Sequence, residues 1–106
     1  MMLNGRPFSN ENGYIDDGLI TRHSQDEIDV VLGWISENIS PRKTPLCEHT
    51  SYGIKHLLKS DTGIYLTNNE FKDAMLLAGY RPVNPDELNW HYRISRKSKA
   101  FTRKTW

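Results

Sequence analysis

Residues 66–80 have the sequence LTNNEFKDAMLLAGY and mark both ends of one helix. Thr67 is a good N-cap, and Glu70 completes a capping box in which the two residues satisfy backbone N–H groups at the helix start. Gly79 favours the left-handed conformation that ends a helix, and Pro82 prevents any continuation. The spacing therefore predicts a helix that begins after Thr67 and ends before Gly79, and the other elements are interpreted around it.

The second half of this helix consists of five consecutive apolar residues, 74–78. Such a run points in nearly every direction around the helix axis, so we expect protein to surround it. We interpret the helix as the hub of the core, with Met75 buried and Phe71 at the centre of the apolar face. The positions that we expect to point outward are Asn69, Lys72, Asp73 and Leu76.

A first helix is predicted from Ser24, where Glu27 completes a second capping box, and it ends before Pro41. Val30 and Trp34 lie on a second face, which either is buried or meets a partner. The apolar stripe that should face the core consists of Ile28, Val31, Leu32, Ile35 and Ile39.

A further helix is predicted over residues 51–60, with Lys55 and Lys59 on its polar side. Residues 64–66 are expected to form a very short strand before the hub helix. The apolar positions of the helix, which we expect to be buried, are Ile54, Leu57 and Leu58.

Two strand signals complete the pattern. Residues 14–21 have the form of a hairpin around Asp17-Gly18, a pair that favours a two-residue turn. Residues 90–95 alternate as a strand, with Arg93 on the outer face together with His91 and Ser95. The inward positions of that strand are Trp90, Tyr92 and Ile94.

These elements predict an α+β fold that is mainly helical, with a three-helix core and a small strand or hairpin element. The helix pair followed by a strand is winged-helix-like at best, and a length of 106 residues suits one domain. We expect a loosely ordered N-terminal segment at 1–22, the globular domain at 23–95 and a basic tail at 96–106.

Charge is distributed unevenly. The net charge is +1, but residues 93–106 contain six bases and no acid, so the remainder is acidic. This basic end could contact nucleic acid or an acidic protein surface, or it could be a solvated, mobile tail. The candidate binding residues are Lys55, Lys59, Arg93, Arg96, Lys97, Lys99, Phe101, Arg103 and Lys104, and Phe101 and Trp106 could stack on unpaired bases.

Motifs for catalysis or metal binding are weak. Cys47 and His49 lack the paired spacing of a structural zinc site, and no nucleophile constellation or phosphate loop is recognisable. We therefore expect no enzymatic activity, metal or cofactor. No apolar run is long enough for a membrane span and no secretory signal is recognisable, so we expect a cytoplasmic protein without a membrane partner. A homodimer could form through the hub helix or the Val30/Trp34 face.

From Thr50 to about Phe101 the chain resembles small uncharacterised proteins of phages and mobile elements of Gram-positive bacteria. The segments that carry the resemblance are TSYGIKHLL (50–58), GIYLTNNEF (63–71), AMLLAGY (74–80) and LNWHY (88–92). The resemblance implies that the chain is a small phage-type protein, a class that mostly binds nucleic acid, regulates transcription or inhibits a host protein. It identifies no catalytic residues.

We expect a phage-type accessory protein that binds nucleic acid through the basic strand end and tail. The alternative is a non-enzymatic inhibitor of a host defence system, of the anti-CRISPR kind. The hub helix is poorly suited to be a DNA recognition helix, because Asp73 would face the phosphates.

Overall fold

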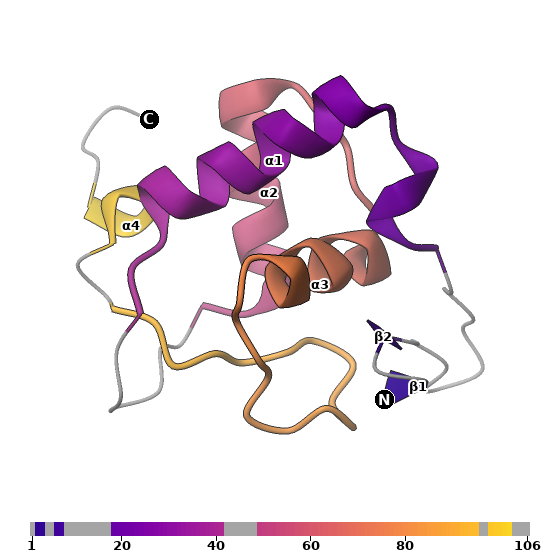
Figure 1. The fold of residues 1–106 in the computed structure, drawn as a ribbon. Coiled ribbons are helices and arrows are strands. Elements are labelled where there is room, and N and C mark those ends of the chain that lie inside the picture. Colours follow the sequence, from indigo (N-terminus) through magenta and orange to yellow (C-terminus); the bar gives the residue numbers. More distant parts are fainter. Residues whose placement is uncertain (1, 4–5, 8–17, 42–48, 96–97, 103–106) are drawn as a thin grey trace.

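Helices dominate the computed structural model, which describes residues 2–3, 6–7, 18–41, 49–95 and 98–102 (Figure 1). In chain order the elements are β1 (Met2–Leu3), β2 (Arg6–Pro7), the 3₁₀ helix η2 (Ile20–Arg22), α1 (Gln25–Asn38), α2 (Ser51–Thr62), α3 (Asn68–Leu77) and α4 (Lys99–Thr102). The two short strands pair antiparallel with each other. The prediction of a mainly helical fold with little strand is confirmed.

The hub helix, α3, begins and ends where its sequence signals lie. The Thr67 side chain accepts a hydrogen bond from the Glu70 N–H at 3.1 Å, and the Glu70 carboxylate accepts one from the Thr67 N–H at 2.9 Å. At the other end Gly79 has a φ of 96°, and its N–H group and that of Tyr80 donate to carbonyls of the last turn. The capping box and the glycine stop are both confirmed.

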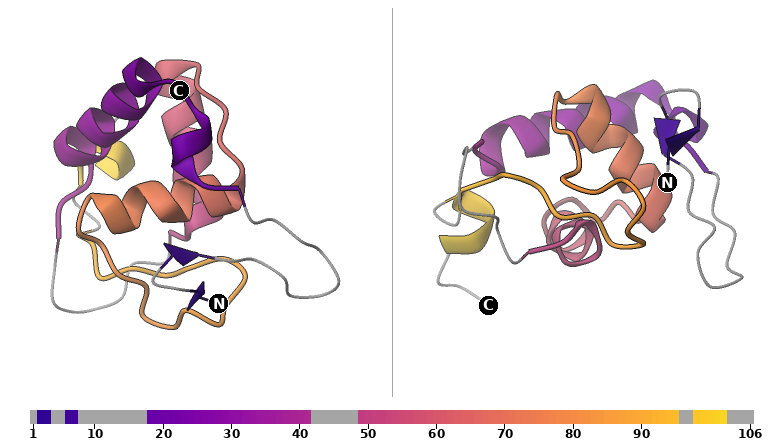
Figure 2. Two further views of the ribbon diagram at one scale, coloured as in Figure 1. Left: turned by 45° about the vertical axis from the view of Figure 1, so that its right-hand side comes forward. Right: turned by 90° about the horizontal axis from the view of Figure 1, so that it is seen from below.

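The α3 helix contacts α1, α2, η2 and β2, which places it at the centre of the fold (Figures 1 and 2). The three long helices contact one another pairwise and bury most of the apolar side chains between them. The buried apolar residues are Ile20, Val31, Trp34, Ile35, Ile39, Ile54, Leu58, Leu66, Phe71, Ala74, Met75, Trp90, Tyr92, Ile94 and Ala100.

The expected burial of α3 is wrong in two respects: its polar first half is enclosed, and its apolar end is exposed. Asn69, Lys72 and Asp73, which were expected to point outward, are fully buried, whereas Leu77 is 52% exposed. The Lys72 ammonium lies 4.9 Å from the centre of the Trp90 ring, a cation–π contact. The reason for the difference is that Pro7, Gly18 and Ile20 on one side and residues 88–90 on another contact the first half of the helix.

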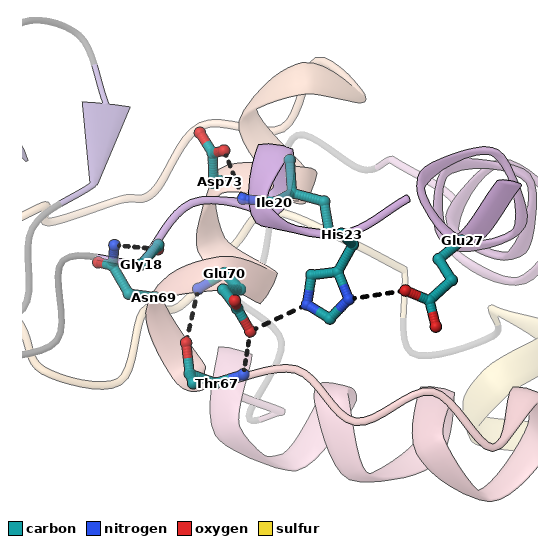
Figure 3. Close-up of polar contacts among 8 residues, drawn as sticks. All are labelled: Gly18, Ile20, His23, Glu27, Thr67, Asn69, Glu70 and Asp73. Atoms are coloured by element: carbon teal, nitrogen blue, oxygen red, sulfur yellow. Dashed lines mark hydrogen bonds and ion pairs between the residues drawn. The ribbon is translucent and has the colours of Figure 1, made fainter. Parts of the chain in front are cut away.

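Buried polar side chains of α3 hold the N-terminal segment, as Figure 3 shows. The Asn69 side-chain amide donates to the carbonyl of Gly18 at 2.7 Å and to that of Pro7 at 3.0 Å. The Asp73 carboxylate accepts a hydrogen bond from the Ile20 N–H at 3.0 Å. These side chains therefore satisfy backbone groups of a segment far away in the sequence, which explains why they are buried.

His23 links this segment to two helices. Its Nδ1 lies 3.1 Å from Oε1 of Glu27 in α1, and its Nε2 lies 3.2 Å from Oε1 of Glu70 in α3 (Figure 3). Burial alone would lower the pKa of His23, but the hydrogen bonds and charges of the two carboxylates outweigh burial and raise it. The imidazolium form therefore stabilises the junction of α1 and α3.

The second face of α1 is divided between burial and exposure. Trp34 is 7% exposed, and its indole N–H donates to Asp61 of α2 at 2.7 Å. Val30 on the same face is 48% exposed. The α2 helix extends to Thr62, beyond the predicted end, and closes at Gly63 in the left-handed conformation.

The strand predictions are only partly supported. The expected hairpin at 14–21 is not confirmed: η2 begins at Ile20 with Leu19 as its N-cap, Asn69 holds Gly18, and residues 14–17 lie outside the described part. Residues 64–66 are irregular. Trp90, Tyr92 and Ile94 point inward as expected, but within the described ranges the strand pairing of residues 90–95 is limited to isolated bridges with Thr50 and Pro41. A winged-helix arrangement is not confirmed.

The ends of the described chain pack on the body. Ile20, within the segment expected to be loose, is fully buried. Ser98 and Ala100 are also buried, and the Ser98 hydroxyl accepts a hydrogen bond from the Ser40 N–H at 2.9 Å. The α4 helix lies beside α1, at the far side of the fold from β1 and β2 (Figure 1). In the described part of the expected tail, Ser98 and Ala100 therefore pack against the body of the fold.

Candidate nucleic-acid interface

One side of α2 carries aromatic and basic residues in a helical stripe. Tyr52, Lys55, His56 and Lys59 are spaced three, four and seven residues from the first, so they share one face. Tyr65 follows in the loop after α2 and returns to the same side, where its ring lies against the two lysines. We call these five residues the tyrosine–lysine face.

Lys55 lies at the centre of this face. Its Nζ is 5.0 Å from the ring centre of Tyr52 and also 5.0 Å from that of Tyr65, and the residue is 6% exposed. The Lys59 Nζ lies 5.5 Å from the ring centre of Tyr65, and this lysine is exposed. Cation–π attraction and packing of the lysine stem therefore hold both rings in place.

The two rings also face solvent. Tyr52 is 51% exposed and Tyr65 is 57% exposed. Few other large apolar or aromatic side chains in the described part of the chain are as exposed. His56 is exposed and meets Tyr52 edge to face, with ring centres 4.6 Å apart. Such a face offers flat aromatic surface next to positive charge, which suits planar, anionic ligands.

A second cationic feature is a cleft of about 340 Å³ at the C-terminal end of α3, which we call the arginine cleft. Within the described ranges neither of its two guanidinium groups is paired with a carboxylate. One wall is fixed by Tyr80, whose hydroxyl donates to the carbonyl of Ile39 at 3.1 Å; burial raises the pKa of this hydroxyl. The lining residues are Pro41, Ala78, Gly79, Tyr80, Arg81 and Arg93.

The residues predicted from sequence occupy different environments. Lys59 and Arg93 are exposed, whereas Lys55 is enclosed by tyrosine rings. Lys99 lies 3.5 Å from Glu37, with side chains 68% and 71% exposed respectively. The remaining basic candidates, and Trp106, lie outside the described residues: Arg96, Lys97, Arg103 and Lys104.

Phe101 has a different environment from the one expected of a free stacking platform. Its ring stacks on that of His49, with centres 3.9 Å apart and planes 7° apart. It also packs against the core. One face of Phe101 is therefore already occupied within the fold.

Sequence reasoning did not single out Tyr52, Tyr65 or Arg81 as site residues. The signal for Tyr52 was present, because it shares helical spacing with Lys55 and Lys59. Tyr65 and Arg81 carried no such signal, since each reaches its neighbours through a loop.

Within the described ranges, no group of three or more His, Cys, Asp or Glu side chains could hold a metal ion. None of the helices described there is both long and apolar enough to cross a membrane. No protein-family model matches the sequence, and no curated protein or solved structure is significantly similar to it.

Proposed function

We propose that this chain binds nucleic acid through two cationic features, the arginine cleft and the tyrosine–lysine face. The observation that carries the proposal is the convergence of Arg81 and Arg93 on one cleft. Two guanidinium groups without a carboxylate partner in the described chain raise the local positive potential. A phosphate can accept charge-assisted hydrogen bonds from both.

Further cations support the proposal. Lys59 is exposed on α2, and Lys99 is exposed on α4. The ion pair between Lys99 and Glu37 is open to solvent, and such pairs are weak, so a phosphate can compete for this lysine. The basic residues at 96–97 and 103–104 would add to the same charge.

The test is a titration of labelled single-stranded and duplex oligonucleotides by fluorescence anisotropy, at about 50 and about 200 mM salt. Binding should be clear at the lower salt concentration and weaken steeply at the higher one. Arg81→Gln and Arg93→Gln should each reduce the slope of log affinity against log salt by about one, because each removes one phosphate contact.

Arg22→Gln is the matched control. Arg22 is also an exposed arginine, but it lies in η2, which precedes α1, whereas the cleft lies past the C-terminal end of α1. This variant should keep the wild-type slope. Absence of binding at low salt would sink the proposal, and equal slopes for all three variants would remove the arginine cleft from it.

The same proposal makes the chain a small phage-type accessory protein without enzymatic activity, acting in the cytoplasm of a bacterial host. This setting rests on the sequence resemblance over residues 50–101. It requires no cofactor, because contacts to phosphates and bases are made by side chains alone.

A second candidate function, inhibition of a host defence protein, is favoured by the outer side of α1. Asp26, Asp29, Val30 and Glu37 are all exposed there and share a helical stripe. An acidic stripe around an apolar residue suits a basic protein partner. Pull-down from nuclease-treated host lysate should then succeed, Asp26→Asn should weaken it, and Arg93→Gln should not.

A further inference from the structure

The tyrosine–lysine face is a more specific surface than electrostatic binding requires. Phosphate contacts need only cations, but here Tyr52 and Tyr65 expose 51% and 57% of their surface. Aromatic rings are costly to expose to water, so two of them beside one lysine call for an explanation. Covering Lys55 explains only the ring surfaces that face its ammonium group.

We infer that the tyrosine–lysine face binds an unpaired nucleic-acid strand by stacking one base on Tyr52 and one on Tyr65. The inference rests on the proposed function and names the strand class that this function uses. Each ring centre lies 5.0 Å from the Lys55 Nζ, so the rings lie within about twice that distance of each other. Nearby nucleotides of one extended strand can span such a separation.

The flanking polar groups fit the backbone of such a strand. The Lys59 Nζ lies 5.5 Å from the ring centre of Tyr65, which places a positive charge beside any base stacked on that ring. His56, which meets Tyr52 edge to face, is exposed beside the other ring. Lys59 therefore pairs with a phosphate, and His56 donates a hydrogen bond to the backbone.

A duplex does not fit this surface in the same way. In a duplex both faces of each base are covered by neighbouring bases, so the tyrosine rings could meet only groove edges and sugars. The cations would attract a duplex and a single strand alike. Preference for a single strand is therefore the property that the two rings add.

The test compares a single-stranded oligonucleotide with its duplex, for the wild type and for Tyr52→Leu and Tyr65→Leu. Each leucine keeps apolar surface and removes the ring, so affinity for the single strand should fall roughly tenfold for each. Affinity for the duplex should change less than twofold. Tyr52→Phe and Tyr65→Phe should retain single-strand binding, because the ring is what stacks.

Two controls separate stacking from other effects. Val30→Ala removes apolar surface of similar exposure on α1 and should leave both affinities unchanged. Arg93→Gln, which lies outside the tyrosine–lysine face, should weaken both substrates equally, because it removes a phosphate contact and leaves the two rings in place. Circular dichroism confirms that each variant is folded before its affinity is compared. In the wild type, the ring protons of both tyrosines should shift upfield when the single strand is added.

The outcomes distinguish this inference from the proposed function. If the leucine variants lose single-strand and duplex binding equally, or lose neither, the stacking inference is overturned and nucleic-acid binding stands. If the wild type binds neither substrate, both are overturned.

Discussion

At the scale of single residues, His23 connects two helices through its contacts with two carboxylates. It lies 3.1 Å from Glu27 and 3.2 Å from Glu70, and so joins α1 to the capping box of α3. Glu70 accepts from the Thr67 N–H with the same oxygen that contacts His23. Loss of the proton from His23 therefore weakens a contact at the start of the central helix.

We predict that stability depends on pH through His23. Its pKa is raised in the folded protein, despite the opposing effect of burial, by the hydrogen bonds and charges of Glu70 and Glu27. The contribution is therefore complete below the unfolded value of about 6.5 and is lost as pH rises through the higher folded value. Melting temperatures measured at a series of pH values should show this loss of stability as the pH rises.

The matched comparison is His23→Gln. The wild type should exceed this variant in melting temperature most clearly between about pH 5 and 6, where the histidine is charged and the carboxylates are ionised. The difference should shrink above neutral pH. A difference that is constant or grows with pH would contradict the proposed ion pairs.

At the scale of elements, α3 shows what the sequence can and cannot predict. Its ends were predictable because the capping box and the glycine stop act within a few residues. The burial of its polar half was not, because Asn69 and Asp73 pair with residues more than fifty positions away. The hairpin predicted at 14–21 is not confirmed: Gly18 and Ile20 pair with α3, and residues 14–17 lie outside the described part.

Two substitutions at the end of α3 test this account of the core. Met75 is fully buried and Leu77 is 52% exposed, although both belong to one apolar run. Met75→Asp should lower the free energy of unfolding by more than about 3 kcal/mol, because a carboxylate would be buried without a partner. Leu77→Asp should change it by less than about 1 kcal/mol.

Chemical denaturation of the two variants measures both values. Similar losses for both would show that a partner or a second copy covers the exposed end of α3. Retention of wild-type stability by Met75→Asp would mean that the core lies elsewhere.

At the scale of the whole molecule, charge and aromatic surface are distributed over separate elements. The exposed side of α1 is acidic, whereas the exposed side of α2 is basic and aromatic. Composition predicted a basic end on an acidic body and so identified Arg93, whereas helical spacing identified Lys55 and Lys59 on the polar side of α2. Arg81 and Tyr65 could not be identified in this way. Only the packing of loops brings Arg81 to Arg93 and Tyr65 to α2.

Nucleic-acid binding by the α2 side of the molecule and the arginine cleft can be measured residue by residue. The backbone amide signals of the ¹⁵N-labelled protein are followed in nuclear magnetic resonance spectra while a single-stranded oligonucleotide is added. We predict shifts at residues 52–59 and 65 and around Arg81 and Arg93, with α1 residues 26–30 unchanged. Shifts confined to α1, or no shifts at low salt, would contradict the account.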